Sequence, residues 1–580
     1  MGHCQRNQYY QMEDLSEFIV YEMKFVSNSA GVGSFTCVPV KEMNFEQVLD
    51  FLKAHPQDQF MYNYLLFTLA EYDQDRLEGL IEQKKEDTQF LSAVYETSIL
   101  KGFQYLRDRL DKIDAREFSR HTPLIFARWA LDRASPGHLF WTGVFVKNTY
   151  NHEPLPSPSE IKFPIPFDLD DINPHSKDIV HIREICSQTD KARITPWIST
   201  RERTAAETVQ NVLRRLSSID LVLGTERESA WSLSPYALER SWRTEVQVAA
   251  GRNRWRLAIP QTSYGKGLEE DQARASYLME IVERYSSFAS FSHDSTIGYK
   301  NEFRIVRSSY TDLVKQGLSV LNPNTMNLEV PYEDQVLYWI TGRETGTDKD
   351  TEIYLPTQFV FLFCNLDEVS LTSGVSSNGL AAGNTEDEAR LHALMEYIER
   401  DADRVGLYSP ERCFTLEAED PTVAHLLNRC RETGRHVQFL DLTTDLGIPC
   451  YKAFIKTGDE FVRGCAADLS GKTAAVSALT ELAYPYFVRS NPPPAGQRTI
   501  KYEDLPDYSS GDVIRDLNTV EKLLLSNGLK PIYVDLTRKD LDIPVVRAFV
   551  PGLEFMTILD RFSNLSKRQF RNYLKTFGVT

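Results

Sequence analysis

The sequence predicts a mixed α/β fold with repeated strand–helix units, preceded by a mainly helical N-terminal domain, and three observations lead to this prediction. Strand-like runs such as "VQFLDLT" and "VVRAFV" alternate with long amphipathic segments in the C-terminal part of the chain. Two fifteen-residue segments, 270–284 and 386–400, repeat one another, which favours a partly duplicated fold. Residues 44–120 carry apolar residues at helical spacing with few glycines between them.

Length and proline content predict the domain boundaries. A chain of 580 residues exceeds what one hydrophobic core usually supports. We expect residues 1–150 to form the helical domain, which would bind a partner or the substrate, and residues 201–580 to form the α/β domain. Residues 151–200 are expected to be a proline-rich linker and lead-in, because proline cannot sustain a helix. The prolines that define it are Pro154, Pro156, Pro158, Pro164, Pro166 and Pro174.

Bulk composition excludes several classes of protein. The formal net charge of -17 argues against a nucleic-acid or anionic-membrane surface. No apolar run reaches the length of a membrane helix, and no signal peptide precedes the first hydrophobic residues. The eight cysteines include no C-x-x-C pair, so a zinc or iron–sulfur site has little support. These features together predict a soluble, cytoplasmic protein without nucleic-acid or membrane partners.

The internal repeat carries an acidic pattern. "EDQARASYLMEIVER" and "EDEARLHALMEYIER" are identical at nine of fifteen positions, at a constant offset of 116 residues. Because a helix turns by about 100° per residue, Ser276, Glu280 and Glu283 lie within about 60° of one another. In the second copy, Glu388 and Glu399 are separated by about 20° of rotation. A weaker third echo, "SALTE", ends at Glu481 and lacks the E-x-x-E-R ending.

A pair of such helices would bring carboxylates together. One E-x-x-E-R helix alone is usually a solvent-facing surface, and duplication could preserve such a surface without a function. If the two helices pack side by side, however, four or five carboxylates converge, which raises their pKa values and destabilises the fold unless cations are present. Mg2+ takes carboxylate oxygens while leaving positions for phosphates. Glutamates, arginines and Mg2+ together indicate phosphoryl chemistry.

The usual nucleotide and nucleophile motifs are absent from the sequence. "GCAADLSGKT" (464–473) has six residues between its glycines where a P-loop has four. "GVSSNG" (374–379) does not have the spacing of a nucleophile elbow. A nucleotide site of a type other than the P-loop remains.

Several ordered motifs resemble the YcaO family. They are "SYGKG" (263–267) followed by "SYLMEIVER", "SSNGLAAG" (376–383) running into "NTEDEARLHALMEYIER", and "DIPVVRAFVPGLE" (542–554). The resemblance covers about two-thirds of the chain, from residue 201 onward. It implies a homodimeric, mixed α/β enzyme that uses ATP and Mg2+ to phosphorylate the oxygen of a backbone amide. A nucleophile then attacks the activated carbon, which gives an azoline, an amidine or a thioamide.

The resemblance also implies residue roles. The implied ATP contacts are Arg201, Thr208, Ser276, Glu280, Arg284, Asn384, Arg400 and Arg547. The implied Mg2+ ligands are Glu280, Glu283, Glu388, Glu396 and Glu399. Glu399, Arg400 and Arg547 are the implied catalytic residues. Arg203 is an alternative to Arg201, and Arg547, an arginine inside an apolar strand, needs an anionic partner in any case.

The product and the partners are less constrained. Azoline-forming members end in a P-x-P-x-P tail, whereas the last proline here is Pro551. We therefore expect thioamidation of a peptide or protein, with a TfuA-like sulfur-delivery partner, or action on a non-peptide amide. An azoline-forming cyclodehydratase, an ATP-binding scaffold that presents a substrate to a partner enzyme, and a structural protein without a nucleotide are the alternatives. Substrate-stimulated ATP turnover would separate the enzyme from the scaffold.

Overall fold

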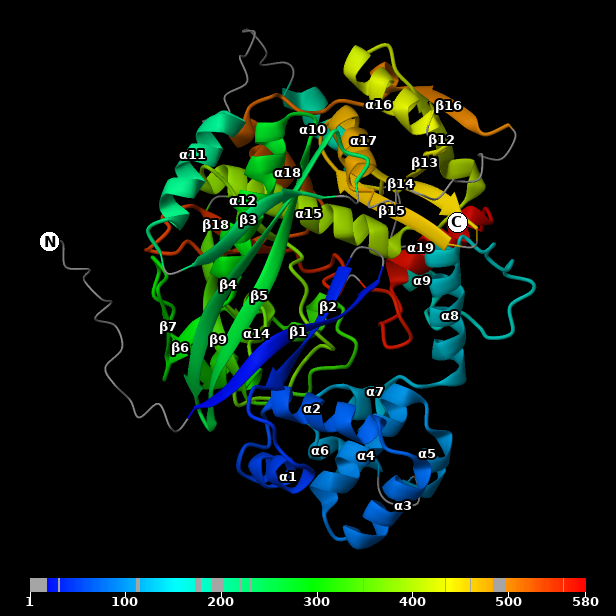
Figure 1. The fold of residues 1–580 in the computed structure, drawn as a ribbon. Helices are drawn as coiled ribbons and strands as arrows, with labels where there is room; N and C mark the ends of the chain where they lie inside the picture. Colours follow the sequence, from blue (N-terminus) through cyan, green and yellow to red (C-terminus); the bar gives the residue numbers. More distant parts are fainter. Residues whose placement is uncertain are drawn as a thin grey trace, which may run out of the picture.

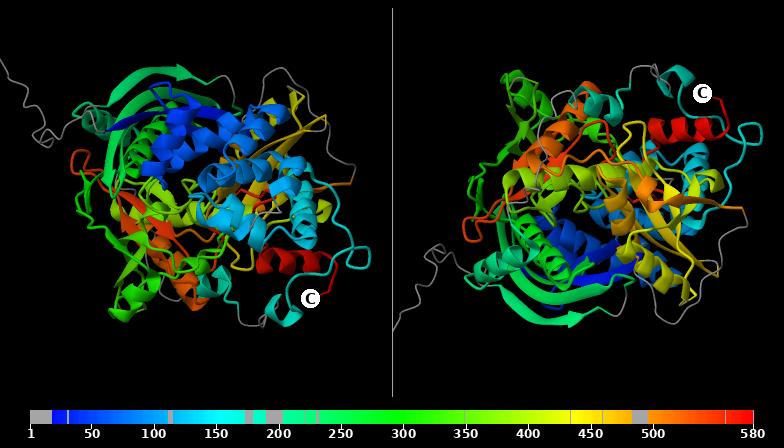
Figure 2. Two further views of the ribbon diagram at one scale, coloured as in Figure 1. Left: turned by 90° about the horizontal axis from the view of Figure 1, so that it is seen from below. Right: turned by 90° about the horizontal axis from the view of Figure 1, so that it is seen from above.

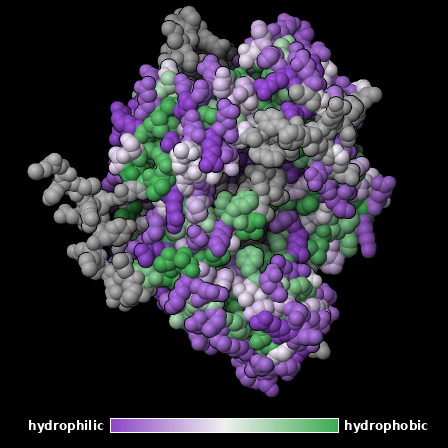
Figure 3. Space-filling model, viewed as in Figure 1, coloured by the Kyte–Doolittle hydropathy of each residue, from purple (hydrophilic) through white to green (hydrophobic). Residues whose placement is uncertain are grey.

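The computed structural model describes residues 18–29, 32–110, 115–172, 179–189, 203–219, 221–229, 232–347, 349–432, 434–458, 460–482, 496–556 and 558–579. These residues form three β-sheets with helices packed between and around them (Figure 1). The predicted mixed α/β fold is therefore confirmed. None of the helices in these ranges combines the length and the apolar composition that crossing a bilayer requires. On the face drawn in Figure 3, hydrophobic side chains form separate patches among hydrophilic ones.

The first sheet holds two N-terminal strands, β1 and β2, in a region whose sequence predicted only helices. Its order is β2-β1-β5-β4-β6-β7, and β3 pairs with β4. The strands are β1 (Ile19–Ser29), β2 (Val32–Pro39), β3 (Val222–Glu228), β4 (Tyr236–Ala250), β5 (Asn253–Gly267), β6 (Ser290–Ser292) and β7 (Ser295–Ile297). Strand β1 pairs in parallel with β5. The start of the chain thus belongs to the same sheet as the "SYGKG" strand.

Helices follow these strands as the apolar periodicity predicts. They are α1 (Phe45–Ala54), α2 (Gln59–Ala70), α3 (Gln74–Gln83), α4 (Thr88–Lys101), α5 (Gln104–Leu110), α6 (Ala115–Arg120), α7 (Phe126–Asp132) and α8 (Pro136–Asn151). Helices α1–α7 form a cap at the lower end of Figure 1, and α8 rises from the cap toward α19 (Lys567–Thr576). Figure 2 shows this cap in front of the sheets when the molecule is seen from below. The proline-rich segment then leads through α9 (Leu169–Ile172) and α10 (Ile182–Thr189) to α11 (Ala205–Leu216).

Two further sheets complete the α/β part. The second sheet has the order β10-β9-β17-β18-β11, with β8 paired to β9, and the third has the order β15-β14-β13-β12-β16. Their strands are β8 (Val306–Ser308), β9 (Leu337–Glu344), β10 (Thr351–Pro356), β11 (Leu380–Ala382), β12 (Cys413–Glu417), β13 (Gln438–Asp441), β14 (Cys450–Thr457), β15 (Glu460–Ala467), β16 (Arg498–Lys501), β17 (Ile532–Asp535) and β18 (Val545–Phe549). The remaining α-helices are α12 (Glu270–Ser287), α13 (Tyr310–Lys315), α14 (Thr357–Val360), α15 (Glu386–Val405), α16 (Pro421–Glu432), α17 (Gly471–Thr480) and α18 (Val513–Ser526).

The sequence repeat is also a structural repeat. Both copies are helices that begin at the same point of the pattern, α12 at Glu270 and α15 at Glu386. Gly267 and Gly383, also 116 residues apart, precede them, and a Cβ on either glycine would press on the backbone nitrogen of Ala273 or Ala389. Each glycine therefore lets the preceding segment approach the first turn of its helix closely. Both helices pack against β11 and β18, so this part of the second sheet is their common support.

A buried carboxyl in the helical cap makes the stability of the fold depend on pH. Glu96 of α4 is fully buried and accepts a hydrogen bond from the backbone nitrogen of Ala127 (3.0 Å). Burial raises the pKa of Glu96 to about 7. Because the pKa of Glu96 is higher in the folded than in the unfolded protein, the free energy of unfolding decreases as pH rises from about 4.5 to about 7. The total decrease is on the order of 3 kcal/mol.

A Glu96→Gln variant keeps an acceptor for Ala127 and removes this titration. We expect its melting temperature to exceed that of the wild type at pH 8 and to match it near pH 5, in thermal melts at both pH values. An equal difference at both pH values would contradict the assignment of the pH dependence to Glu96.

Candidate active site

Four glutamates from the repeated helices converge on one region. Glu280 and Glu283 lie on α12, and Glu396 and Glu399 lie on α15. Their side chains are 31, 17, 24 and 16% exposed, respectively. They are thus reachable from solvent but poorly hydrated. Glu283 and Glu396 repel each other, as do Glu280 and Glu396, so the carboxylates of the two helices face one another.

Each helix supplies one arginine in the same position. Arg284 lies 3.7 Å from a carboxylate oxygen of Glu280 and 3.5 Å from one of Glu283. In the second copy, Arg400 lies 3.8 Å from Glu396 and 3.7 Å from Glu399. These are ion pairs without hydrogen-bond contact, since hydrogen-bonded nitrogen and oxygen atoms lie at 2.7–3.2 Å. The guanidinium groups thus balance part of the acidic charge and keep donors for another anion.

The cluster carries more negative charge than its cations balance. Burial raises the pKa of Glu280 and Glu396, and it raises the pKa of Glu283 well above its usual value. The pKa of Glu399 rises to about 8, through burial and then through repulsion from Glu396. Arg284 and Arg400 lower these pKa values but do not cancel the effect of burial. A divalent cation would relieve this cost.

A third arginine lies beneath the cluster. Arg547 of β18 is fully buried and donates to the backbone oxygens of Val360 (3.2 Å) and Ser376 (2.6 Å). Burial lowers the pKa of Arg547 to about 10, while the charges of Glu396 and Glu283 oppose this shift. Arg547 is therefore still a cation at neutral pH. The anionic partner that its apolar strand requires is the glutamate cluster itself.

A second polar group lies at the N-terminal end of α15. The Thr208 hydroxyl of α11 donates to the side-chain oxygen of Asn384 (3.1 Å), and the Asn384 backbone nitrogen donates to Glu388 (3.0 Å). Glu388 precedes Glu396 by eight residues, about 12 Å along a helix. The structure thus does not bring Glu388 into the four-glutamate cluster. Ser276 is an exposed residue one turn before Glu280, and Arg201 lies outside the described residues.

A helix that packs on the third sheet also contributes to the site, which the sequence did not predict. Glu481, which ends the "SALTE" echo after α17, repels both Glu280 and Glu399 and pairs with Lys266 of the "SYGKG" strand (2.6 Å). The same strand donates the Tyr264 backbone nitrogen to Glu280 (2.9 Å). In the sequence, the position of Glu481 in the "SALTE" echo corresponds to that of Glu280. This correspondence was only a weak indication of a shared site, because the echo lacks the second glutamate and the arginine.

A second group behind Arg400 was also missed. Asp403 of α15 forms an ion pair with the buried Lys452 of β14. The thiols of Cys450 and Cys465 lie 3.9 Å apart on the neighbouring strands β14 and β15. The carboxylate of Asp403 also favours the charged form of Arg400. The spacing of the two cysteines in the sequence resembles no metal or redox motif, so only the packing of α15 on the third sheet reveals the group.

The cluster fits Mg2+ that is held jointly with phosphates. Among the described residues, no three histidine, cysteine or acidic side chains stand together as a preformed metal cage. Mg2+ usually takes one or two carboxylates and completes its octahedron with water and substrate phosphate oxygens. The four glutamates of the cluster could supply the carboxylate ligands of Mg2+. Arg284 and Arg400 keep hydrogen-bond donors for the phosphates that would complete its coordination.

Comparison with known proteins assigns the chain to a family. A family model described as YcaO cyclodehydratase, ATP- and Mg2+-binding, matches residues 264–488 and 484–554, which is half of the chain. The chain belongs to the YcaO family. The matched span contains both repeated helices and the β18 strand, and hence the whole glutamate–arginine cluster. ATP and Mg2+ are the cofactors of this YcaO chain.

The chain matches two uncharacterised relatives over most of the length of each relative. A protein of Methanothermobacter thermautotrophicus is 29% identical over 336 residues, which cover 51% of this chain and 82% of the relative. A protein of Rhizobium leguminosarum bv. trifolii, described as lying in the tfuA 3' region, is 26% identical over 351 residues, covering 53% of this chain and 80% of the relative.

A solved YcaO structure also matches. The YcaO protein of Methanopyrus kandleri, solved with AMPPCP and Mg2+, is 22% identical with a TM-score of 0.46. The match covers 63% of this chain and 95% of that one.

Proposed function

We propose that this YcaO chain uses ATP and Mg2+ to phosphorylate the oxygen of a backbone amide in a peptide or protein, and that sulfur then replaces this oxygen. The observation that carries the proposal is the cluster of four glutamates and three arginines between α12 and α15. The carboxylates of the cluster are suited to bind Mg2+, and its arginines are suited to bind phosphate.

The residues of the cluster receive separate roles in this proposal. Glu280, Glu283, Glu396 and Glu399 hold Mg2+, which neutralises the phosphate charge when it is bound. Arg284 and Arg400 face the phosphates, Arg547 stabilises the glutamates from beneath, and Arg400 and Glu399 orient the amide against the terminal phosphate. The polar group at the start of α15 contacts the more distant part of the nucleotide. That group comprises Thr208, Asn384, Glu388 and, on the neighbouring helix, Ser276.

The reaction balances as an exchange of oxygen for sulfur. The amide oxygen attacks the terminal phosphorus, and ADP leaves. A sulfide nucleophile then attacks the amide carbon, and the carbon–oxygen bond breaks as phosphate departs with the amide oxygen. The protein mainly positions the reactants and compensates charge, which is how enzymes accelerate phosphoryl transfer. The tfuA-region description of the Rhizobium relative supports sulfur delivery by a TfuA-like partner.

The test combines turnover with product mass. We expect the chain, supplied with Mg2+, ATP, sodium sulfide and a peptide extract of the host cell, to release phosphate in a peptide-dependent manner. Mass spectrometry should show a peptide whose mass rises by the difference between sulfur and oxygen. ATP hydrolysis without any change in peptide mass would contradict the proposal and favour the scaffold.

One alternative product has specific support. The matching family description names a cyclodehydratase, and an azoline-forming enzyme would use a cysteine, serine or threonine of the substrate as the nucleophile. In the same experiment, an azoline is recognised by the loss of one water from the peptide without a requirement for sulfide. The cluster serves both reactions, because the phosphorylation step is common to them.

A further inference from the structure

A fifth carboxylate lies beside the glutamate cluster but does not belong to the repeated helices. Glu481 follows α17, and its charge repels Glu280 of α12 and Glu399 of α15. It thus acts on both helices from the side of the third sheet. The Glu481 side chain is 51% exposed, whereas those of the four cluster glutamates are 16–31% exposed. Glu481 is therefore the acidic group of the site that a substrate reaches most easily.

Two contacts fix the position of Glu481. The Lys266 ammonium of β5 donates to its Oε2 atom (2.6 Å). Behind it, Gly464 of β15 lies so close that a Cβ atom on this glycine would be 2.6 Å from the Glu481 Cβ atom. A glycine at this position therefore lets the end of α17 pack directly on β15. The carboxylate is held between β5 and β15, and its Oε1 atom can accept a proton.

Glu481 has its own cation, which distinguishes it from the four cluster glutamates. The arginine nitrogens of the cluster stay 3.5–3.8 Å from the carboxylate oxygens, outside hydrogen-bond contact. Lys266 instead donates directly to Glu481, and hydrogen bonds between ionised groups are the stronger kind. Glu481 therefore remains an anion without a metal ion, as a group that accepts a proton must.

The repeat pattern of the sequence supports a separate role for this residue. The "SALTE" echo places Glu481 where the first copy has Glu280. The echo lacks the second glutamate and the arginine that follow in both complete copies. The third-sheet helix thus contributes one acidic group to the site and no arginine for a phosphate.

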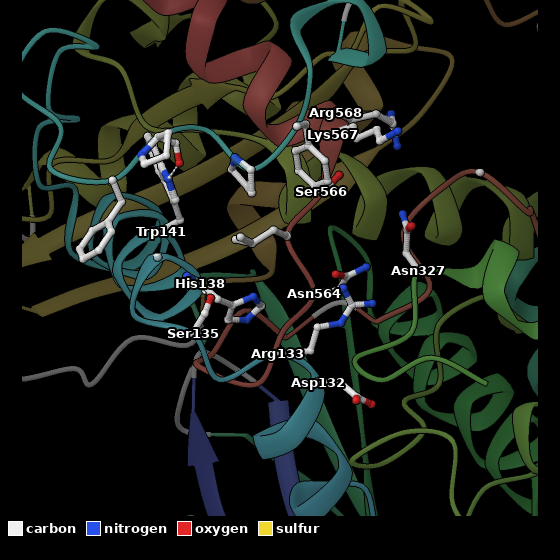
Figure 4. A pocket seen from close by; sticks show the side chains of 17 residues that line it. Asp132, Arg133, Ser135, His138, Trp141, Asn327, Asn564, Ser566, Lys567 and Arg568 are labelled. Atoms are coloured by element: carbon white, nitrogen blue, oxygen red, sulfur yellow. Dashed lines mark hydrogen bonds between the residues drawn. The ribbon is translucent and has the colours of Figure 1, made fainter. Parts of the chain in front are cut away.

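A pocket of about 770 Å³ beside α19 does not open onto this part of the site. The turn from α7 into α8, the proline-rich segment and the start of α19 line it (Figure 4). Its Arg568 forms an ion pair with Asp401, which is turned by about 200° from Glu399 around the axis of α15. Its Lys567 lies over the Phe167 ring (5.7 Å). These two cations hold α19 in place, on the face of α15 that points away from Glu399.

The proposed reaction requires a proton acceptor near the amide. Transfer of phosphate to the amide oxygen draws electrons from the nitrogen and makes its N–H proton acidic. A base that removes this proton leaves a neutral imidate, and such a positioned base typically contributes a factor of about 10²–10⁴ to the rate. The four cluster glutamates are assigned to Mg2+ in the proposed function, so the base must come from elsewhere in the site.

We propose that Glu481 is a catalytic residue that accepts the N–H proton of the substrate amide as the amide oxygen attacks the terminal phosphate. This inference rests on the proposed function and adds the proton-transfer step to it. The oxygen–phosphorus bond forms, ADP leaves, and the proton moves to Oε1 of Glu481. When hydrosulfide then attacks the carbon, Glu481 returns its proton to the nitrogen. The carbon–oxygen bond breaks, and phosphate carries away the amide oxygen and the proton of the sulfur.

This role restricts the substrate to amides that carry a proton on nitrogen. The nitrogen of a proline residue has no N–H. We therefore expect that no thioamide forms at a residue that precedes proline, and fragmentation of the product peptides by mass spectrometry locates the modified residue.

The mutational test separates proton transfer from metal binding. It uses the full chain with Mg2+, ATP, sodium sulfide and the peptide extract of the host cell. We expect Glu481→Gln, which keeps the size and an acceptor for Lys266, to lose about 100-fold in peptide-stimulated phosphate release. Mg2+ and ATP should raise its melting temperature as much as that of the wild type. The matched control Glu460→Gln, at the exposed start of β15, should change neither property.

A small carboxylate should replace the missing side chain. Glu481→Ala removes the carboxylate, and because the side chain is half exposed, formate has access to the vacated position. We expect sodium formate to increase the peptide-stimulated phosphate release of Glu481→Ala, and sodium chloride at the same concentration to leave it unchanged. The same addition should not increase the release by the wild type.

The outcomes separate this proposal from the proposed function. Wild-type turnover by Glu481→Gln would overturn it, and so would a thioamide at a residue that precedes proline. If Glu481→Gln lost the effect of Mg2+ and ATP on melting, Glu481 would be a metal ligand instead. No response of Glu481→Ala to formate would indicate a role in packing alone. A wild type without peptide-stimulated phosphate release would contradict the proposed function itself, which is a different result from any of these.

Discussion

A Glu399→Gln variant is expected to lose substrate-stimulated ATP hydrolysis and, without nucleotide, to melt at a higher temperature than the wild type at pH 7.5. Loss of a Mg2+ ligand accounts for the lost turnover, which we expect to fall by at least a factor of 100, or about 2.7 kcal/mol of barrier. The gain in stability follows from the pKa of about 8 that burial and Glu396 give to Glu399. Phosphate release and thermal melts measure the two effects.

The sign of the stability change follows from proton linkage. A folded-state pKa above the unfolded value of 4.5 means that the folded protein loses stability as pH rises from about 4.5 to about 8. Glutamine does not titrate, so the variant escapes this loss. The gain at pH 7.5 is about 2–4 kcal/mol, reduced by the 16% exposure of the side chain.

Two controls accompany this prediction. Glu386→Gln, at an exposed position in the first turn of the same helix, should change neither turnover nor melting temperature. At pH 5 the stability advantage of Glu399→Gln over the wild type should shrink. A Glu399→Gln variant that turns over ATP normally would remove Glu399 from the proposed site.

The sequence contained the information for part of this architecture. Alternating strand-like and amphipathic segments indicated the α/β fold, and the duplicated acidic pattern indicated that α12 and α15 would present the same charges. Rotation about the helix axis placed Glu388 beside Glu399, but the eight residues between Glu388 and Glu396 correspond to about 12 Å along the helix, so position along the axis has to be considered together with rotation. The domain limits, the residue roles and the homodimer stay predictions.

Other features depend on long-range packing that no local pattern encodes. Strands β1 and β2 are stabilised by the pairing of β1 with β5, which lies more than 200 residues further along the chain. Glu481 enters the site because α17 packs on β14 and β15, and β15 in turn packs on α15. The pocket beside α19 combines residues separated by more than 400 positions, as Arg133 and Lys567 show. Such constellations arise from tertiary structure alone.

An Arg547→Met variant is expected to lose ATP turnover as well, but its stability should change in the opposite direction. Removal of this buried cation leaves the backbone oxygens of Val360 and Ser376 without their donor and the Glu283 and Glu396 carboxylates without its charge. Loss of one partner from a buried charge network costs about 3–5 kcal/mol. Arg304→Met, which breaks an exposed pair with Asp294, should cost at most about 1 kcal/mol.

The opposite signs test one physical statement, that the cluster holds more negative charge than its arginines balance. If that is correct, removal of a carboxylate relieves the nucleotide-free protein, and removal of a cation strains it further. Mg2+ with ATP should then raise the melting temperature of the wild type and leave that of the Glu399→Gln variant nearly unchanged, in melts with and without nucleotide. Destabilisation by both Glu399→Gln and Arg547→Met would show instead that the charges are already balanced, and that the cluster needs no metal.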